Sequence, residues 1–322
     1  MRALARQSRT TIRCLVRDPD DAALLAVAGP EVEAIVGDVR DPAAIDRLFE
    51  GIGAATVFHA AAVIHPQRST RELFDVNVGG TQLVLDRARR VQATRFLHVS
   101  SNSPFGANPT AGERFDEESR YAPYLAYGQS KLEAEQLVQR AHDRGDVSTV
   151  ILRPPWFYGP YQPARQTQFF AAVRRGRFPC IAPGTQQRSM VYTGNLVDGL
   201  LCAEVAAAAP GRAYWIADAE PYALADILTT VRSALTAEGL PVSSRGAVRI
   251  PRTVGVVAEQ ADRVLQATGR YVQAVHVLGE LKDTIACDIT RARAELAYEP
   301  VVSLFDGMRT SIRWCLDRGR AI

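Results

Sequence analysis

Short apolar runs alternate with amphipathic segments along the first half of the chain. The runs that predict strands are residues 11–17, 32–36, 55–59, 95–99 and 148–152. The segments that predict helices are residues 20–28, 42–51, 69–91 and 124–143. Several of the runs are apolar throughout, and strands that alternate with helices indicate a parallel sheet covered on both faces. The sequence therefore predicts an α/β fold.

The second half contains more helix than strand. We expect one strand at residues 213–216 and helices at 166–176, 197–209, 222–237, 253–268 and 304–318. A length of 322 residues corresponds to one large domain or two modest ones. Residues 241–286 show no motif, and we expect them to determine substrate specificity.

Composition excludes several classes of protein. The net charge of +3 is too small, and too evenly spread, to indicate a nucleic-acid partner. No run of 18 apolar residues is present, so we expect no membrane span. The five cysteines are scattered without a C-x-x-C pair, which favours reduced thiols in the cytoplasm. The five histidines lack the spacing of a metal site, and we predict no metal.

A tyrosine and a lysine one helical turn apart are the strongest chemical signal. Tyr127 and Lys131 share one face of the predicted helix 124–143. A nearby ammonium favours the phenolate and lowers the tyrosine pKa toward neutrality, which makes a general acid/base. The alternative is an exposed pair at helical spacing. Only two of the 38 basic residues are lysines, so this spacing seldom arises by chance.

The motif Tyr127-x-x-x-Lys131 is accompanied by the pair Ser100-Ser101 upstream and the stretch Leu152–Pro154 downstream. In these motifs, and from about residue 3 to residue 316, the chain resembles the extended short-chain dehydrogenase/reductase family. This family includes nucleotide-sugar epimerases and dehydratases and 3β-hydroxysteroid dehydrogenase-like enzymes. The resemblance implies a Rossmann-type doubly wound parallel sheet with a smaller, interleaved C-terminal domain. We expect a dinucleotide-binding domain at 1–165 and 190–217, and a substrate-binding domain at 166–189 and 218–322.

The resemblance also implies catalytic and substrate-binding residues. Tyr127 would exchange a proton with the substrate oxygen, and Lys131 would hold the nicotinamide ribose. Ser101 would bind the substrate oxygen, because it lies four residues before the aromatic residue of Phe105-Gly106. Asn102 occupies the position at which dehydratases of the family have an acidic residue, so dehydratase activity is less expected for this chain. Arg188 would grip a diphosphate, or it is a solvated arginine.

Residues at successive strand ends would bind the cofactor, because ligands of such sheets lie at the carboxyl ends of the strands. By resemblance, Asp38 and Val39 would contact the adenine, and Asn77 would support the active-site helix. The usual position of a ribose-binding carboxylate aligns with Val16, and the next residue, Arg17, favours NADP over NAD because an arginine suits a 2′-phosphate. The neighbouring Asp18 is a carboxylate that suits a ribose hydroxyl, so NAD stays an alternative. The other expected cofactor-binding residues are Ala60, Ala61, Ala62, Tyr127, Lys131 and Pro154.

The beginning of the chain departs from the family pattern. The expected strand and G-x-x-G-x-x-G turn, whose amides face the pyrophosphate, are not found, and residues 1–7 resemble the later half of the following helix. We expect that roughly twenty residues are absent from the sequence, judged by the usual strand and turn of this fold. The alternative is a natural remnant. Either way, we expect the chain alone to bind dinucleotides weakly.

These observations favour an NAD(P)-dependent oxidoreductase or epimerase. The substrate is a nucleotide sugar or a hydrophobic alcohol or ketone, and the sequence does not choose between them. A homodimer is one expected assembly. A non-catalytic binding or regulatory protein, or an inactive truncated form, is the alternative class.

Overall fold

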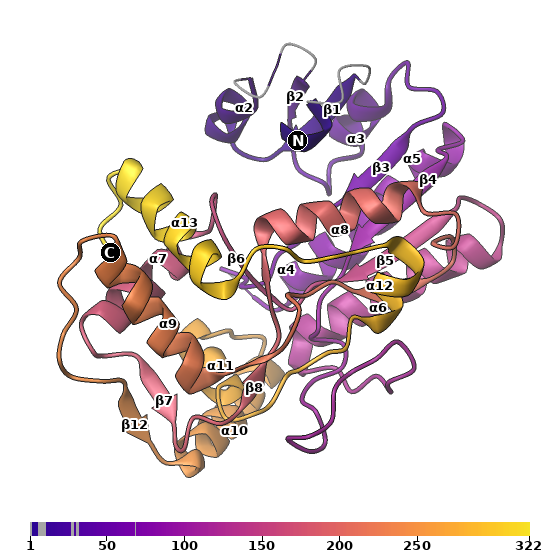
Figure 1. The fold of residues 1–322 in the computed structure, drawn as a ribbon. Coiled ribbons are helices and arrows are strands. Elements are labelled where there is room, and N and C mark those ends of the chain that lie inside the picture. The colour runs from indigo at the N-terminus through magenta and orange to yellow at the C-terminus, as the bar shows by residue number, and fades with distance from the viewer. Residues whose placement is uncertain (1, 6–10, 27–28, 30–31, 68) are drawn as a thin grey trace.

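A parallel four-stranded sheet forms the centre of the computed structural model, which describes residues 2–5, 11–26, 29, 32–67 and 69–322 (Figure 1). Its order is β10-β5-β4-β3. The strands are β3 (Thr56–His59), β4 (Arg95–Val99), β5 (Thr149–Arg153) and β10 (Ala213–Trp215). Each lies within two residues of its predicted position, so the predicted parallel sheet is confirmed.

Two further strands form a separate parallel pair. They are β1 (Ile12–Val16) and β2 (Val32–Val36), in register from Ile12 opposite Val32. Across the described ranges, β1 pairs with β2 and not with β3. The short helix α1 (Arg2–Ala5) precedes β1 in sequence, and α2 (Pro19–Ala26) lies between β1 and β2.

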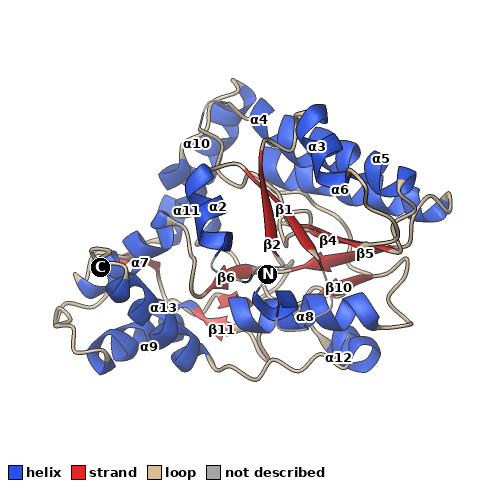
Figure 2. Cartoon of the chain, turned by 90° about the horizontal axis from the view of Figure 1, so that it is seen from above, coloured by secondary structure: helices blue, strands red, loops and turns tan. Residues whose placement is uncertain are grey.

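Helices cover both faces of the sheet (Figure 2). On one face lie α3 (Pro42–Phe49), α5 (Thr81–Arg90) and α6 (Leu125–Asp143), and on the other α8 (Thr193–Val205) and α12 (Thr290–Leu296). Successive strand residues point to opposite faces. Phe96 and Ile151 therefore pack with α3, α5 and α6, whereas Leu97 and Leu152 pack with α8 and α12. The doubly wound Rossmann-type architecture follows from this alternation.

The predicted helix 69–91 is continuous but not uniform. It consists of α4 (Arg71–Phe74), the π-helical turn η1 (Asp75–Gly80) and α5. At its centre Gly80 approaches Val39, and a Cβ there would lie 2.7 Å from a Val39 methyl group. A wide turn of this type often marks a functional site, and this one carries Asn77.

The remaining elements form a smaller body, at the lower left of Figure 1. Its strands are β6 (Trp156–Tyr158) with β9 (Met190–Tyr192), β7 (Pro179–Ile181) with β12 (Val248–Ile250), and β8 (Gln187–Arg188) with β11 (Tyr222–Ala223). Its helices are α7 (Ala164–Arg174), α9 (Leu224–Ala237), α10 (Arg252–Ala267), α11 (Gln273–Glu280) and α13 (Leu304–Asp317). A core between α7, α9 and α13 contains Phe170, Val231 and Ile312.

Several elements differ from the sequence prediction. The helix predicted at 197–209 runs from 193 to 205, and the short strands of the smaller body were not predicted. Strands of two or three residues are too short to show alternation, and their pairing partners are distant in sequence.

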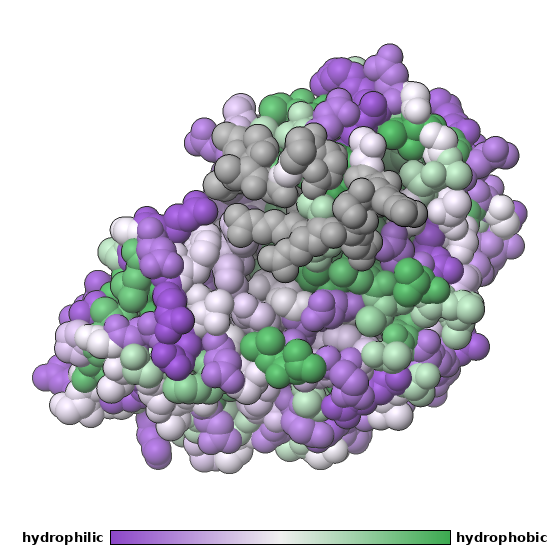
Figure 3. Space-filling view, turned by 45° about the horizontal axis from the view of Figure 1, so that its top comes forward, coloured by the Kyte–Doolittle hydropathy of each residue, from purple (hydrophilic) through white to green (hydrophobic). Residues whose placement is uncertain are grey.

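The face shown in Figure 3 is largely hydrophilic, with apolar residues in small groups. No described helix is both long enough and apolar enough to cross a bilayer.

Candidate active site

Helix α6 lies directly on the chain segment that follows β4. Gly128 makes this approach possible, because a Cβ at that position would lie 2.5 Å from the carbonyl oxygen of Ser103. The Tyr124 N–H, just before the helix, donates to the same oxygen at 3.0 Å. Tyr127 is buried, and it is the third residue of α6. The helix therefore brings Tyr127 close to the segment that contains Ser101.

Ser101 is buried at the carboxyl end of the sheet. Its Oγ accepts from the Ser103 N–H at 3.3 Å and lies 3.4 Å from the Ser103 hydroxyl. The neighbouring Ser100 continues the ladder of the sheet, since its N–H donates to Leu152 O at 2.7 Å. Asn102 is half-buried, and its carbonyl accepts from the Phe105 N–H in the turn that follows.

Lys131 extends from α6 to the end of β4 and is fully buried. Its Nζ donates to Val99 O at 2.8 Å and lies 3.4 Å from His98 Nε2. Burial lowers the pKa of this ammonium to about 8, although the charge of Glu135 acts in the opposite direction. The ammonium is therefore held at Val99, two residues before Ser101 in the chain. The charge of Glu135 compensates it only in part.

Two histidines lie beside this lysine and were not predicted as part of the site. His59 and His98 are register partners on β3 and β4, and their rings stack 5.5 Å apart. Burial, followed by the charge of Lys131, lowers the pKa of His59 to about 3 and that of His98 well below its usual value. Both are neutral at pH 7, so His98 Nε2 can accept from Lys131. In the sequence, the indication was that both histidines lie near the carboxyl ends of predicted strands, where ligands of such sheets bind.

Asn77 links the end of β3 to the active-site helix. Its Oδ1 accepts from the Val63 N–H at 2.8 Å, and its Nδ2 donates to Val63 O at 2.9 Å. The same Nδ2 donates to Ser130 Oγ at 3.0 Å, and Ser130 donates to Tyr127 O at 2.8 Å. This network fixes α6 relative to Val63, which follows the alanines at 60–62.

A buried ion pair fixes α6 on its other side. Arg153, the last residue of β5, contacts Glu135 of α6 at 2.8 Å, and both side chains are almost completely buried. Tyr121 donates to Glu135 at 2.9 Å and accepts from Arg153 at 2.7 Å. The guanidinium also lies 4.7 Å from the centre of the Phe105 ring. Glu135 was not predicted, although it is four residues after Lys131 on the same helix face.

The residues expected to hold a dinucleotide lie at the ends of β1, β2 and β3. Asp38 forms an ion pair with Arg40 at 2.7 Å, and that arginine, with a smaller contribution from Arg17, holds the pKa of Asp38 below its usual value. The Arg17 charge is therefore near Asp38, and its side chain is exposed. The remaining positions are Val39 and Pro154, which are buried, and Ala60, Ala61 and Ala62, which are exposed.

These strand-end residues fit a dinucleotide, although no glycine-rich turn that would face its pyrophosphate is found in the sequence. Three exposed alanines at one strand end leave the backbone open to close approach by a ligand. An arginine and a carboxylate stand at the neighbouring strand ends, where ligands of open α/β sheets bind. Within the described ranges, no three His, Cys, Asp or Glu side chains are grouped so that they could hold a metal ion.

Arg188 lies on β8, in the smaller body. It is 8% exposed, and its guanidinium donates to the main-chain oxygen of Glu280 in α11. Burial lowers the pKa of Arg188, and the nearby Glu280 and Asp283 oppose that shift. The interpretation as a solvated arginine is therefore wrong. In this structure the side chain connects β8 to α11.

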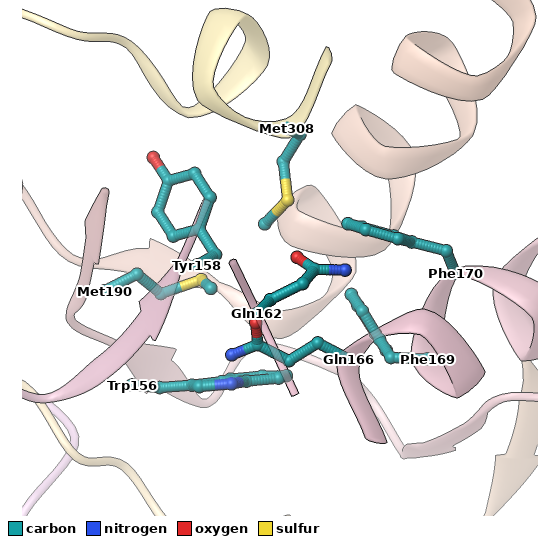
Figure 4. A pocket seen from close by; sticks show the side chains of 8 residues that line it. All are labelled: Trp156, Tyr158, Gln162, Gln166, Phe169, Phe170, Met190 and Met308. Carbon is teal, nitrogen blue, oxygen red and sulfur yellow. The ribbon is translucent and has the colours of Figure 1, made fainter. Parts of the chain in front are cut away.

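A small apolar cavity of about 10 Å³ lies beside β6 (Figure 4). Such a volume holds about one water molecule. Gln162 and Gln166 are its two amide side chains, and the Oε1 atom of each is buried without a hydrogen-bond partner. Trp156 and the other apolar lining residues belong to, or pack against, the core between α7, α9 and α13, so the cavity lies inside the smaller body. The other lining residues are Tyr158, Phe169, Phe170, Met190 and Met308.

Comparison with known proteins identifies the family. The profile of the NAD dependent epimerase/dehydratase family matches residues 1–217. The chain belongs to this family. It is 39% identical to the uncharacterized protein y4nL of Sinorhizobium fredii, over 96% of this chain and 86% of that protein. It is 28% identical to a 4-hydroxy-2-methyl-3-oxo-4-farnesyl-3,4-dihydroquinoline-1-oxide ketoreductase of Stigmatella aurantiaca, over 92% of this chain and 87% of that one.

A solved structure of similar fold is the NAD complex of UDP-glucuronic acid 4-epimerase from Bacillus cereus. Its TM-score is 0.75 at 20% identity, and the match covers 98% of this chain and 94% of the epimerase. These findings confirm the predicted Rossmann-type fold and family, whose members are dehydrogenases, epimerases and dehydratases. The chain is therefore an NAD-dependent oxidoreductase or epimerase of this family.

Burial of Lys131 predicts a specific pH dependence of stability. Its pKa falls from an ordinary value of 10.5 to about 8 on folding, so the unfolded chain binds more protons between these two values. Native stability therefore rises with pH across this window. We expect the melting temperature of the wild type, relative to Lys131→Met, to increase from pH 7.5 to pH 9.5.

The same substitution at Lys282 is the control, because Lys282 forms an ion pair with Glu259 at 3.0 Å. The melting temperature of the wild type relative to Lys282→Met should show no such rise. A constant difference between wild type and Lys131→Met over this range would contradict the burial of a charged Lys131.

Proposed function

We propose that the chain is an NAD(P)-dependent reductase or dehydrogenase that acts on a hydrophobic ketone or alcohol. The observation that carries the proposal is the attachment of α6 to the segment after β4. It brings Tyr127 and Lys131 to the chain that holds Ser101, through Gly128 and the Lys131–Val99 hydrogen bond. These three residues are the acid/base group, the charge beside it and the hydroxyl that the reaction requires.

In the reducing direction, the Tyr127 phenol gives its proton to the substrate oxygen. Ser101 donates a hydrogen bond to that oxygen and orients it. The Lys131 ammonium stabilises the phenolate that remains, because an opposite charge favours the ionised form. A nicotinamide supplies the hydride to the carbonyl carbon when it is bound. Hydride and proton together convert the ketone to the alcohol.

One structural feature favours a hydrophobic substrate over a nucleotide sugar. Arg188, the residue expected to grip a diphosphate, is buried and donates to Glu280 O. The ketoreductase from Stigmatella aurantiaca, whose name describes a farnesyl-bearing ketone, supports the same substrate class.

The side chains at the strand ends favour NADP. Asp18 would suit a ribose 2′-hydroxyl, but its Oδ1 accepts from the Asp20 N–H at 2.9 Å. Asp38 is paired with Arg40. Arg17 is exposed beside them and would contact a 2′-phosphate. Val39, Ala60, Ala61, Ala62, Asn77, Lys131 and Pro154 would complete the dinucleotide site.

Loss of the Tyr127 hydroxyl should abolish turnover but leave cofactor binding. A positioned acid/base contributes roughly 10²–10⁴-fold to the rate. We expect Tyr127→Phe to lower kcat by that factor with hydrophobic ketones and NADPH, measured by absorbance of the nicotinamide. The dissociation constant for NADPH should change little. Tyr161→Phe removes a hydroxyl from an exposed tyrosine and should keep wild-type turnover.

Unchanged turnover in Tyr127→Phe would overturn the assignment of the acid/base. A wild type that binds NADPH but transfers no hydride, with ketones or with nucleotide sugars, would instead favour the non-catalytic binding protein.

Arg17 should set the preference between the two cofactors. A charge-assisted hydrogen bond contributes about 1.5–3 kcal/mol, or roughly ten- to a hundredfold in affinity. Calorimetric titration should show tighter binding of NADPH than of NADH, and Arg17→Ala should remove most of that difference. Arg175→Ala, at an exposed arginine after α7, should leave it unchanged. Tighter binding of NADH by the wild type would contradict the assignment.

A further inference from the structure

The first turn of the active-site helix lacks a cap from its own sequence. An α-helix begins with backbone N–H groups that have no partner within the helix. Tyr124, at the capping position, makes no side-chain hydrogen bond to them. Instead, the Ala126 N–H donates to Gln266 Oε1 at 3.1 Å. A residue of α10, 140 positions later in the chain, thus caps the helix that carries Tyr127.

The carboxamide of Gln266 is held in one orientation. Its Nε2 donates to Asp262 Oδ1 at 3.0 Å, one turn earlier on α10. A flipped amide would place a donor against the Ala126 N–H and an acceptor against a carboxylate, which excludes that orientation. Asp262 is completely buried, and its Oδ2 lies 2.7 Å from His276 Nδ1 in α11. The hydrogen bonds thus run from α11 through α10 to α6.

Aromatic rings enclose this network where α10, α11 and α6 meet. Around the His276 ring, the centres of Tyr124, Tyr271 and His65 lie 5.2, 5.3 and 6.3 Å away. Burial lowers the pKa of His276, but the hydrogen bond to Asp262 and the charge of Glu280 outweigh it and raise that pKa overall. The paired helices α10 and α11 lie together in the lower part of Figure 1.

The backbone between the two attachments of α6 is strained. The Tyr124 N–H donates a hydrogen bond to Ser103 O, and the Ala126 N–H donates one to Gln266 Oε1. Leu125, between these two residues, has a φ of +52°. A bulky residue in the left-handed region is uncommon and persists only where its surroundings impose it. Removal of one attachment would let Leu125 relax and shift the first turn. Tyr127 lies in that turn, so its position depends on Gln266.

We propose that Gln266 is a positioning residue for the reaction, oriented by Asp262 and His276. It acts through the first turn of α6, and the inference rests on the proposed function for its kinetic consequences. Segment 241–286, expected to determine specificity, would then also control the position of the acid/base. A displacement of about 1 Å can lower a rate by roughly 10²-fold.

Replacement of the amide by an apolar side chain tests the cap. We expect Gln266→Leu to lower kcat ten- to a hundredfold with a smaller change in KM. Amide exchange in the peptide that covers Ala126 should become faster. Gln260→Leu is the matched control, because Gln260 is exposed on the same helix and belongs to no part of the network. Equal kcat and equal exchange in the two variants would overturn the proposal.

A second variant separates positioning from a general loss of stability. In Gln266→Glu, the introduced carboxyl faces Asp262 and His276, and the Tyr124 ring packs against His276. When protonated, it can donate to Asp262 and accept from Ala126, as the amide does, but when ionised it repels Asp262. The ratio of its kcat to that of the wild type should therefore rise as the pH falls from 8 to 5.5. A ratio that is independent of pH would overturn the proposal.

The exchange measurement also separates this inference from the proposed function. If the wild type transfers no hydride, the proposed function fails, and exchange at Ala126 still decides whether Gln266 caps the helix. Faster exchange in Gln266→Leu than in Gln260→Leu would support the cap, and equal exchange would refute it.

Discussion

The buried ion pair between Arg153 and Glu135 is the constraint on which the site depends. Separation of such a pair leaves an uncompensated charge in the interior and costs about 3–5 kcal/mol. The pair joins the last residue of β5 to the middle of α6, with Tyr121 bonded to both partners. Helix α6 therefore cannot slide along the sheet without a large loss of stability, and Tyr127 and Lys131 keep their places relative to Ser101.

Lys131 places a second buried charge in this rigid arrangement. Its ammonium is buried against a main-chain oxygen and a neutral histidine, and no carboxylate contacts it directly in the described structure. Such a charge disfavours folding, and proteins retain costly groups where function requires them. The neutral His59–His98 pair is compatible with this interpretation, because both rings are held uncharged beside the ammonium.

Much of the Rossmann-type core could be predicted from the sequence. Strands β2 and β4 lie at their predicted positions, because local periodicity records which residues face the two helix layers. Local spacing also predicted the placement of Tyr127 and Lys131 on one helix. The missed residues act through long-range contacts. Gln266 caps a helix 140 residues away, and nothing around it in the sequence records that partner.

The smaller body was predicted least well, for a related reason. Its two- and three-residue strands pair across large separations, as Val248–Ile250 does with Pro179–Ile181. Arg188 shows the same limitation. The family resemblance implied a diphosphate ligand, with solvent as the alternative, whereas the structure connects Arg188 to α11 through Glu280 O. Side chains of this body owe their contacts to tertiary packing, which periodicity does not encode.

In the proposed reaction, Tyr127 and Ser101 bind one substrate oxygen at the carboxyl end of β4. A crystal structure of the chain with NADP and a hydrophobic ketone would show whether they do. Hydrogen-bonded donors and acceptors lie about 2.6–3.2 Å apart. We expect the Tyr127 hydroxyl and Ser101 Oγ both to lie within this distance of the ketone oxygen. A ketone bound with its oxygen away from both hydroxyls would contradict it.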